Sequence, residues 1–302
     1  MKSVLQLGRI LYHAEDAHEG MATLFGGDAG TMIMIMLWLT VFGAVWGSFA
    51  DCAVSRWASG ERVLAGRSHC TSCGHVLGVV DLIPVLGWFL RRGRCHYCGE
   101  KIPVECLVAE LAGAVGFLCI AIGIGPKVEL GIWFFFYSGN TGLLFTAFEL
   151  VKWMVFWAVL LTISLTDWAK RIIPDMLLVV LAVSRVIWFF VLKERVSVAI
   201  DAAWALIVPA ALLVMVLLTE KFMGREVMGG GDIKLMFVFA LYLTWPKLLL
   251  TLLVGCLAGL VFAVLSGKKR GMPMPFGPFL AVGALLAACF GDPLVEWYFS
   301  LF

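Results

Sequence analysis

Charged residues are scarce in this chain. Only 15% of its 302 residues are charged, whereas 62% are hydrophobic and the mean hydropathy is +0.96. A soluble domain is typically about 45–50% apolar. The composition therefore excludes an ordinary soluble protein. It predicts a polytopic membrane protein that is embedded in the lipid bilayer. The net charge of +2 gives no indication of a nucleic-acid partner.

Several familiar sequence signals are missing as well. No G-x-x-x-x-G-K-[ST] motif occurs, which argues against a phosphate-binding loop. No period of 20 to 50 residues suggests a repeat array, and no long low-complexity linker divides the chain. The first thirty residues lack the basic start and compact apolar core of a cleavable signal peptide. We therefore interpret residues 1–30 as a tail outside the membrane or a short surface helix.

Apolar stretches near the ~20 residues that a membrane helix needs predict an all-α protein with about eight transmembrane helices. The expected spans are 31–54, 106–124, 148–166, 176–192, 196–218, 233–243, 248–265 and 276–290. The sixth and eighth are short for a full crossing. Residues 131–147 are apolar enough to form a re-entrant or interfacial piece. This pattern divides the chain into a first helix at 31–54, a polar unit at 55–105 and a membrane core at 106–302.

The distribution of Lys and Arg predicts the orientation, because short cytoplasmic loops carry the excess of basic residues. Most basic loop residues fall on one side if the loop after the first helix is cytoplasmic and the spans alternate strictly. We therefore expect the tail at 1–30 to be extracytoplasmic and the unit at 55–105 to be cytoplasmic.

Four cysteines in that unit form two C-x2-C pairs, Cys70 with Cys73 and Cys95 with Cys98. Their spacing is typical of four-thiolate zinc sites, and a glycine after each pair suits a tight metal-binding turn. A redox pair and unpaired thiols are the alternatives. Four protein ligands leave no open position, so we expect a structural Zn²⁺ in a small zinc-binding domain.

Two acids stand at the edges of separate apolar spans on the predicted cytoplasmic face. Asp167 ends one apolar run, and Asp232 follows Gly229, Gly230 and Gly231 at the start of another. Carboxylates within hydrogen-bond reach can share a proton and act as acid and base. The alternative is that both merely lie near helix ends, where an N-terminal dipole favours Asp. Asp175, directly after a proline, is expected to cap the fourth helix.

These motifs together resemble the type IV prepilin peptidases, intramembrane aspartyl proteases of the GxGD class. The resemblance covers residues 43–281. Its motifs are, in chain order, Gly47-Ser48-Phe49 with Arg56, the two cysteine pairs, Ile83-Pro84-Val85-Leu86-Gly87-Trp88, Arg92-Gly93-Arg94-Cys95, Glu110, Asp167 with Ile173-Pro174-Asp175, Gly229-Gly230-Gly231-Asp232-Ile233-Lys234, and Pro275-Phe276-Gly277-Pro278.

The resemblance implies that Asp167 and Asp232 are the catalytic pair and that Gly229, Gly230, Gly231 and Lys234 belong to the active-site loop. It implies cleavage of type IV prepilin or pseudopilin leaders at the cytoplasmic face of the bacterial cytoplasmic membrane. Members with the cysteine-rich loop also N-methylate the new N-terminus with S-adenosylmethionine, and this chain retains that loop.

The chain departs from the family pattern at two positions. Asp51 replaces an Asn near the first helix, and Leu82 replaces an Asn after Asp81. Both lie near the region associated with methylation, so a leader peptidase without methyltransferase activity stays an alternative. Asp51, Asp81, Glu105 and Glu110 are polar candidates near the loop, although we expect each to pair with a neighbouring Arg or backbone amide.

Two alternatives belong to other classes of protein. A proton-coupled transporter also carries acids in membrane helices, but places them near the midplane among broken helices. A zinc-dependent membrane scaffold would use Asp167 and Asp232 only at helix ends. The depth of the two acids separates the peptidase from the transporter, and loss of processing on their substitution separates it from the scaffold.

Overall fold

The structure is a computed structural model of the chain. It describes residues 29–63, 66–136, 141–191, 203–224, 228–266 and 274–301. The predicted tail at 1–30 lies almost entirely outside the described residues.

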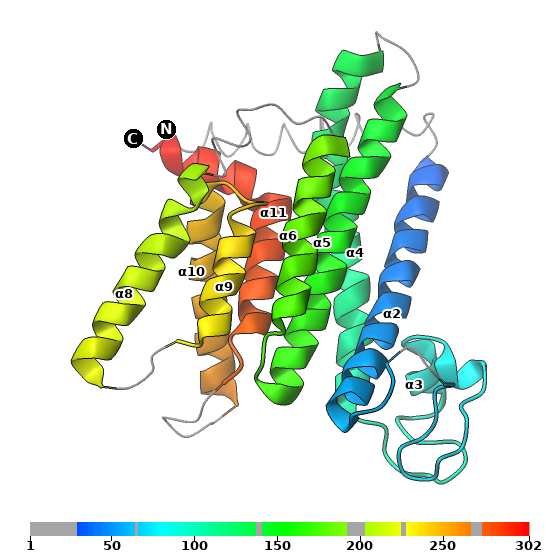
Figure 1. The fold of residues 1–302 in the computed structure, drawn as a ribbon. Helices are drawn as coiled ribbons and strands as arrows, with labels where there is room; N and C mark the ends of the chain where they lie inside the picture. Colours follow the sequence, from blue (N-terminus) through cyan, green and yellow to red (C-terminus); the bar gives the residue numbers. More distant parts are fainter. Residues whose placement is uncertain are drawn as a thin grey trace.

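Within the described residues the chain is all helical, as predicted (Figure 1). The long helices are α2 (Ala29–Ser59), α4 (Val104–Phe136), α5 (Thr141–Lys170), α6 (Asp175–Val191), α8 (Ile207–Met223), α9 (Gly230–Phe239), α10 (Trp245–Leu265) and α11 (Gly277–Phe299). Two short elements, η1 (Val80–Leu82) and α3 (Leu86–Leu90), lie between α2 and α4. The long helices run side by side as one bundle, and the unit that holds η1 and α3 lies at one end of it.

Among the described residues, six helices are long and apolar enough to cross a membrane, where the sequence predicted about eight spans; the one that contains α8 is counted from Ala203 to Met223. The helix α6 has 17 residues, and α9 has only 10 and is too short for a full crossing. The sixth predicted span is therefore short, as expected. The eighth is not, because α11 continues to Phe299 and has 23 residues.

In the described part of the stretch 131–147, residues 131–136 and 141–147 belong to the helices α4 and α5 and not to a separate re-entrant piece. The helix α4 continues to Phe136 and α5 already begins at Thr141, so most of this apolar stretch extends two membrane helices. An apolar composition alone cannot distinguish a re-entrant piece from the ends of two long helices.

Small residues bring α2 and α4 together. A Cβ atom at Gly43 would collide with the carbonyl of Gly113, and one at Gly47 would collide with the carbonyl of Ala109. Helices in lipid gain little from hydrophobic burial and associate through such close backbone contacts. The GxxxG spacing of Gly43 and Gly47 thus fixes the first helix against α4.

Tryptophan side chains join α5 to the same pair of helices. The indole N–H of Trp46 on α2 donates to the carbonyl of Ala158 at 3.0 Å, and that of Trp157 donates to the carbonyl of Ala112 at 3.3 Å. A polar N–H inside an apolar bundle requires such an acceptor. These contacts place the C-terminal half of α5 in the centre of the molecule.

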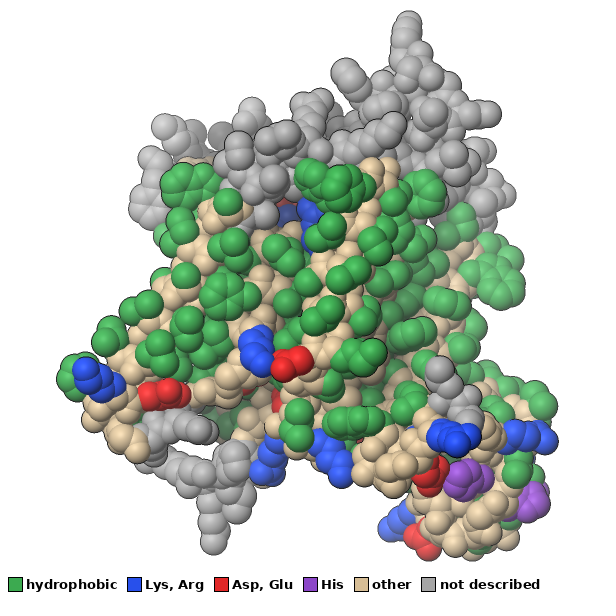
Figure 2. All heavy atoms as spheres, viewed as in Figure 1, with side chains coloured by type: hydrophobic (Ala, Val, Ile, Leu, Met, Phe, Trp, Pro, Cys, Tyr) green, Lys and Arg blue, Asp and Glu red, His purple; other side chains and the backbone are tan. Residues whose placement is uncertain are grey.

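The surface of the bundle is apolar, as expected for contact with lipid. Hydrophobic side chains cover the face shown in Figure 2, and many Lys, Arg and His side chains gather toward the end that carries the unit between α2 and α4. With its six candidate spans, the chain is a multi-pass membrane protein.

Candidate active site and metal centre

Asp167 lies in the last turn of α5 and is 6% exposed. Its Oδ2 accepts the backbone N–H of Gly277 at 2.9 Å. Gly277 is the first residue of α11, where a backbone N–H has no partner within its own helix. The helix N-terminus therefore directs a donor at the carboxylate, and the two are 110 residues apart in sequence.

A side chain at position 277 would disturb this contact. A Cβ atom at position 277 would lie 2.8 Å from Oδ2 of Asp167 and 3.4 Å from the Cβ atom of Asp167. Glycine allows the amide to approach the carboxylate this closely. The sequence analysis missed this role of Gly277, although it included the residue in a motif. Pro278, in the first turn of α11, was the available sequence signal for the helix start.

Asp232 lies in the first turn of α9 and is 9% exposed. Its carboxylate interacts electrostatically with that of Asp167. The C-terminal end of α5 and the N-terminal ends of α9 and α11 all lie at the end of the bundle nearest the cysteine unit (Figure 1). The structure thus brings the two predicted acids to one end of the molecule.

The three glycines before Asp232 do not have the left-handed backbone that glycine favours. Two of them instead allow close approach: a Cβ at Gly229 would lie 3.2 Å from Asp232 Oδ2, and one at Gly231 would lie 3.0 Å from Cβ of Ile173. Gly230 has no such neighbour. The glycines therefore leave space beside the carboxylate and let the link after α5 pack on α9.

Lys234 is paired with an acid outside the proposed catalytic pair. Its Nζ binds Asp175 Oδ1 at 2.7 Å, which joins α9 to the first residue of α6. Both side chains are well exposed, so the pair contributes little stability, about 0–1 kcal/mol. Asp175 thus lies at the start of the fourth long helix, as expected, and also provides an ion-pair partner that the sequence analysis did not predict.

The four cysteines Cys70, Cys73, Cys95 and Cys98 form one cluster, and their sulfur atoms all lie within 4.8 Å of one another. A tetrahedral Zn²⁺ with Zn–S bonds of about 2.3 Å separates its sulfurs by about 3.8 Å. Cys70 and Cys98 Sγ are 3.9 Å apart. The arrangement therefore fits a structural zinc ion.

Each cysteine pair folds as the same small turn. Cys70 N–H donates to the carbonyl of His75, and Cys95 N–H donates to that of Glu100. Gly74 and Gly99, which follow the pairs, have φ angles of +70° and +73°. Glycine adopts this left-handed conformation without steric cost, which explains the glycine after each C-x2-C.

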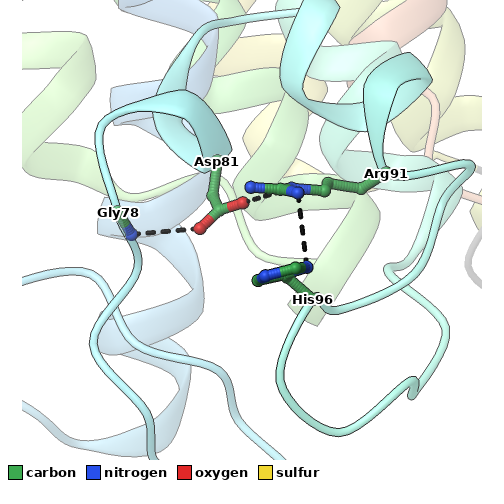
Figure 3. A network of polar contacts seen from close by, with 4 residues as sticks. All are labelled: Gly78, Asp81, Arg91 and His96. Carbon is green, nitrogen blue, oxygen red and sulfur yellow. Dashed lines mark hydrogen bonds and ion pairs between the residues drawn. The ribbon is translucent and has the colours of Figure 1, made fainter.

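Asp81 and Arg91 hold the segment between the two turns (Figure 3). Arg91 Nε donates to Asp81 Oδ1 at 2.6 Å, and the Gly78 N–H donates to Oδ2 at 3.1 Å. Burial alone raises the pKa of Asp81, but these donors outweigh it and hold the pKa below its ordinary value. Arg91 also contacts His96 Nδ1 at 3.3 Å. Asp81 thus has both the Arg and the backbone-amide partner that we expected.

The other polar candidates near the loop differ. Glu110 Oε2 accepts the backbone N–H of Val85 at 2.6 Å, as expected. Asp51 interacts with the Cys106 thiol, and among the described residues the structure shows no Arg or backbone-amide partner for it. Glu105 is exposed and interacts electrostatically with Asp51.

Comparison with known proteins now supplies the family. Residues 41–124 match the "Bacterial Peptidase A24 N-terminal domain", and residues 154–264 match the "Type IV leader peptidase family". A Stutzerimonas stutzeri protein named "Prepilin leader peptidase/N-methyltransferase" is 30% identical over 237 residues, covering 76% of this chain and 74% of that protein. The chain belongs to the type IV leader peptidase family.

Other relatives of this chain are also named "Prepilin leader peptidase/N-methyltransferase". The Bacillus subtilis (strain 168) protein is 29% identical over 268 residues, which cover 87% of this chain and 97% of that protein. The Aeromonas hydrophila protein is 29% identical over 248 residues, which cover 80% and 77%. No solved structure matches the chain. The family match and the relatives extend over both the cysteine unit and the acid pair.

Proposed function

We propose that this enzyme of the A24 peptidase family cleaves the leader from type IV prepilins or pseudopilins, with Asp167 and Asp232 as its catalytic pair. The observation that carries the proposal is the arrangement of two buried, electrostatically coupled carboxylates at the ends of α5 and α9. Buried carboxylates are costly in a membrane protein and mark functional sites.

In this proposal Asp167 is the base. The Gly277 N–H holds Oδ2, which orients the carboxylate and leaves Oδ1 for a water molecule. The base draws a proton from the water as its oxygen attacks the peptide carbonyl carbon. Asp232 donates its proton to the carbonyl oxygen, and the pair later returns a proton to the departing amine. General acid–base help of this kind contributes about 10²- to 10⁴-fold in rate.

The substrate assignment rests on the family and on the depth of the acids. A prepilin has a basic leader followed by an apolar helix, so the helix can lie in the bilayer while the leader stays in water. The junction then reaches the membrane face at the depth of the helix ends. The proposed site lies at the cytoplasmic face of a bacterial cytoplasmic membrane, consistent with the basic residues near the cysteine unit.

The methyltransferase activity is a second part of the proposal. Relatives with the name "Prepilin leader peptidase/N-methyltransferase" match across the cysteine unit, and this chain retains the tetrad. A methyl group would move from the sulfonium of S-adenosylmethionine to the new N-terminal amine, which loses a proton. In this proposal the tetrad holds Zn²⁺, which organises the loop and takes no part in the transfer.

The positions of the acids weigh against the two alternatives from other classes. A transporter places its acids near the midplane among broken helices, whereas Asp167 lies in a last turn and Asp232 in a first turn. A scaffold would use each acid as a partner of its own helix end. Asp167 instead accepts a donor from a different helix, α11.

The test is incubation of the purified chain, in proteoliposomes, with a panel of prepilins. Mass spectrometry should detect a leader released by one cut before the apolar helix. Addition of S-adenosylmethionine should increase the mass of the mature pilin by one methyl group. Cleavage without methylation would show that the enzyme is a peptidase without methyltransferase activity. If a folded enzyme cleaves none of the prepilins, the proposed substrate class is contradicted.

A further inference from the structure

The segment 79–90, which includes η1 and α3, carries large apolar side chains that are exposed in the described part of the chain. Phe89 is 58% exposed, Leu90 65% and Val79 82%. Val80, Leu82, Ile83 and Leu86 are exposed as well. Contiguous exposed apolar surface of this kind marks a protein or membrane contact. We call residues 79–90 the apolar segment.

The apolar segment lies beside the membrane helices, not at the far side of the cysteine unit. The N–H of Val85 donates to Glu110 Oε2 at 2.6 Å, and Glu110 lies six residues beyond Val104, the start of α4. Six helical residues advance about 9 Å along the axis. Val85 is therefore level with the second turn of a helix that crosses the membrane. Figure 1 shows α3 beside the lower part of α2 and above the lowest part of the cysteine unit.

The backbone at this junction is unusual and firmly held. Val85 has φ +65° and ψ −55°, and the N–H of Leu86 donates to the carbonyl of Pro84. This is a γ-turn of the rare, strained kind. A β-branched residue keeps such a conformation only where its surroundings fix it. The Glu110 carboxylate provides that constraint and holds the segment at this depth.

The charges of the region suit contact with a bilayer. Asp81 is the charged residue within the apolar segment, and its carboxylate is 9% exposed and paired with Arg91. Insertion of the apolar segment into lipid therefore brings no unpaired charge into the membrane. Arg92 and Arg94, which follow α3, are exposed and lie where lipid headgroups would meet them.

We propose that the apolar segment inserts Leu86, Phe89 and Leu90 into the membrane leaflet beside α2 and α4. The partner is the lipid surface: its acyl chains contact the apolar side chains and its anionic headgroups contact the arginines. The insertion anchors the cysteine unit to the bilayer. This inference does not depend on the proposed catalytic activity.

Photocrosslinking of the full chain tests the proposal. The photoreactive residue p-benzoylphenylalanine replaces Phe89 in proteoliposomes of phosphatidylcholine and phosphatidylglycerol, and mass spectrometry detects adducts after irradiation. Tyr97 is the matched control, because it is an exposed aromatic residue of the same unit between two cysteines of the tetrad. The expected result is a phospholipid adduct at position 89 in at least about tenfold excess over position 97.

Leu90 provides a second probe position if the change at Phe89 prevents folding, and an unchanged zinc content shows that the unit is intact. Equal lipid adducts at 89 and 97 would overturn the proposal. So would an adduct at 89 with a second copy of the chain and none with lipid, because the segment would then be a protein interface. A folded variant with no adduct at either probe position would also overturn it.

Discussion

At the scale of single residues, a backbone amide contacts one of the two acids directly. Gly277 reaches Asp167 because it has no side chain, and a Cβ there would lie 2.8 Å from the carboxylate oxygen. In Gly277→Ala the carboxylate must move, and misplacement by a fraction of an ångström to 1 Å costs on the order of 100-fold in rate. Steady-state cleavage of a prepilin measures this loss.

The matched control is Gly259→Ala on α10, where a Cβ would meet Phe279 at an ordinary contact distance of 3.6 Å. This variant should cleave at the rate of the unsubstituted chain. Equal activity of the 277 and 259 variants would show that the Gly277 amide does not position Asp167.

The Asp81 carboxylate predicts a pH dependence in the cysteine unit. Its pKa lies below the ordinary value in the folded chain, so its contribution to stability is present at neutral pH and is lost as the pH falls through the folded pKa. Asp81→Asn should therefore speed amide exchange of Gly78 at pH 7. The difference from the unsubstituted chain should shrink on acidification below about pH 4. An equal difference at both pH values would contradict the assigned role of the charge.

The sequence predicts side chains better than it predicts backbone partners. Asp167, Asp232 and the four cysteines stand out because their chemistry is unusual for their surroundings. The role of Gly277 could not be predicted. A backbone N–H donor is not marked by any particular residue type, and its partner lies 110 residues away in the sequence. Lys234 was assigned to the active-site loop by resemblance, yet its side chain binds Asp175.

At the scale of elements, the α2–α4 contact depends on small residues. Gly47→Val would drive a branched side chain into the carbonyl of Ala109. Overpacking of a close contact costs typically about 1–3 kcal/mol, and more where the backbone cannot move. The expected result is a lower melting temperature of the purified chain in detergent. Val45→Ala, at an exposed position of the same helix, should change it little, and equal melting temperatures of both variants would contradict this packing.

The cysteine unit should depend on its metal, because residues 60–103 contain only short helices among the described residues. A unit of this size buries too little apolar surface to fold firmly without a staple. We expect one zinc per chain by elemental analysis and its loss in Cys73→Ser. Cys256→Ser, which changes an exposed cysteine of α10, should retain the zinc. Unchanged zinc in Cys73→Ser would argue against the tetrad.

Helix boundaries show where sequence periodicity reaches its limit. The short length of α9 was predicted, but the helix begins at Gly230, three residues before the predicted start at 233. The end of α11 was placed too early, at residue 290, whereas the helix continues through Pro293 to Phe299. The length of a helix thus depends on neighbours that local residues do not reveal.

At the scale of the whole molecule, hydropathy predicts the order of the helices and the alternation of their ends. The predicted spans correspond in order to the eight long helices of the described residues. The contacts among these helices could not be predicted, because similar apolar surfaces face lipid and protein alike. One end of the bundle holds the acid pair, the cysteine unit and many basic residues, and the orientation of this end toward the cytoplasm stays a prediction.

The central claim is that Asp167 and Asp232 together cleave a prepilin. Its most direct test is the single-turnover rate of leader release by Asp167→Asn and Asp232→Asn. Asp292→Asn is the control, because it changes an acid of α11 that is paired with Lys247 near the opposite end of the helix. We predict that each of the first two variants is folded and loses at least about 10²-fold in rate, while the control keeps its activity. Full leader release by either folded variant would contradict the account.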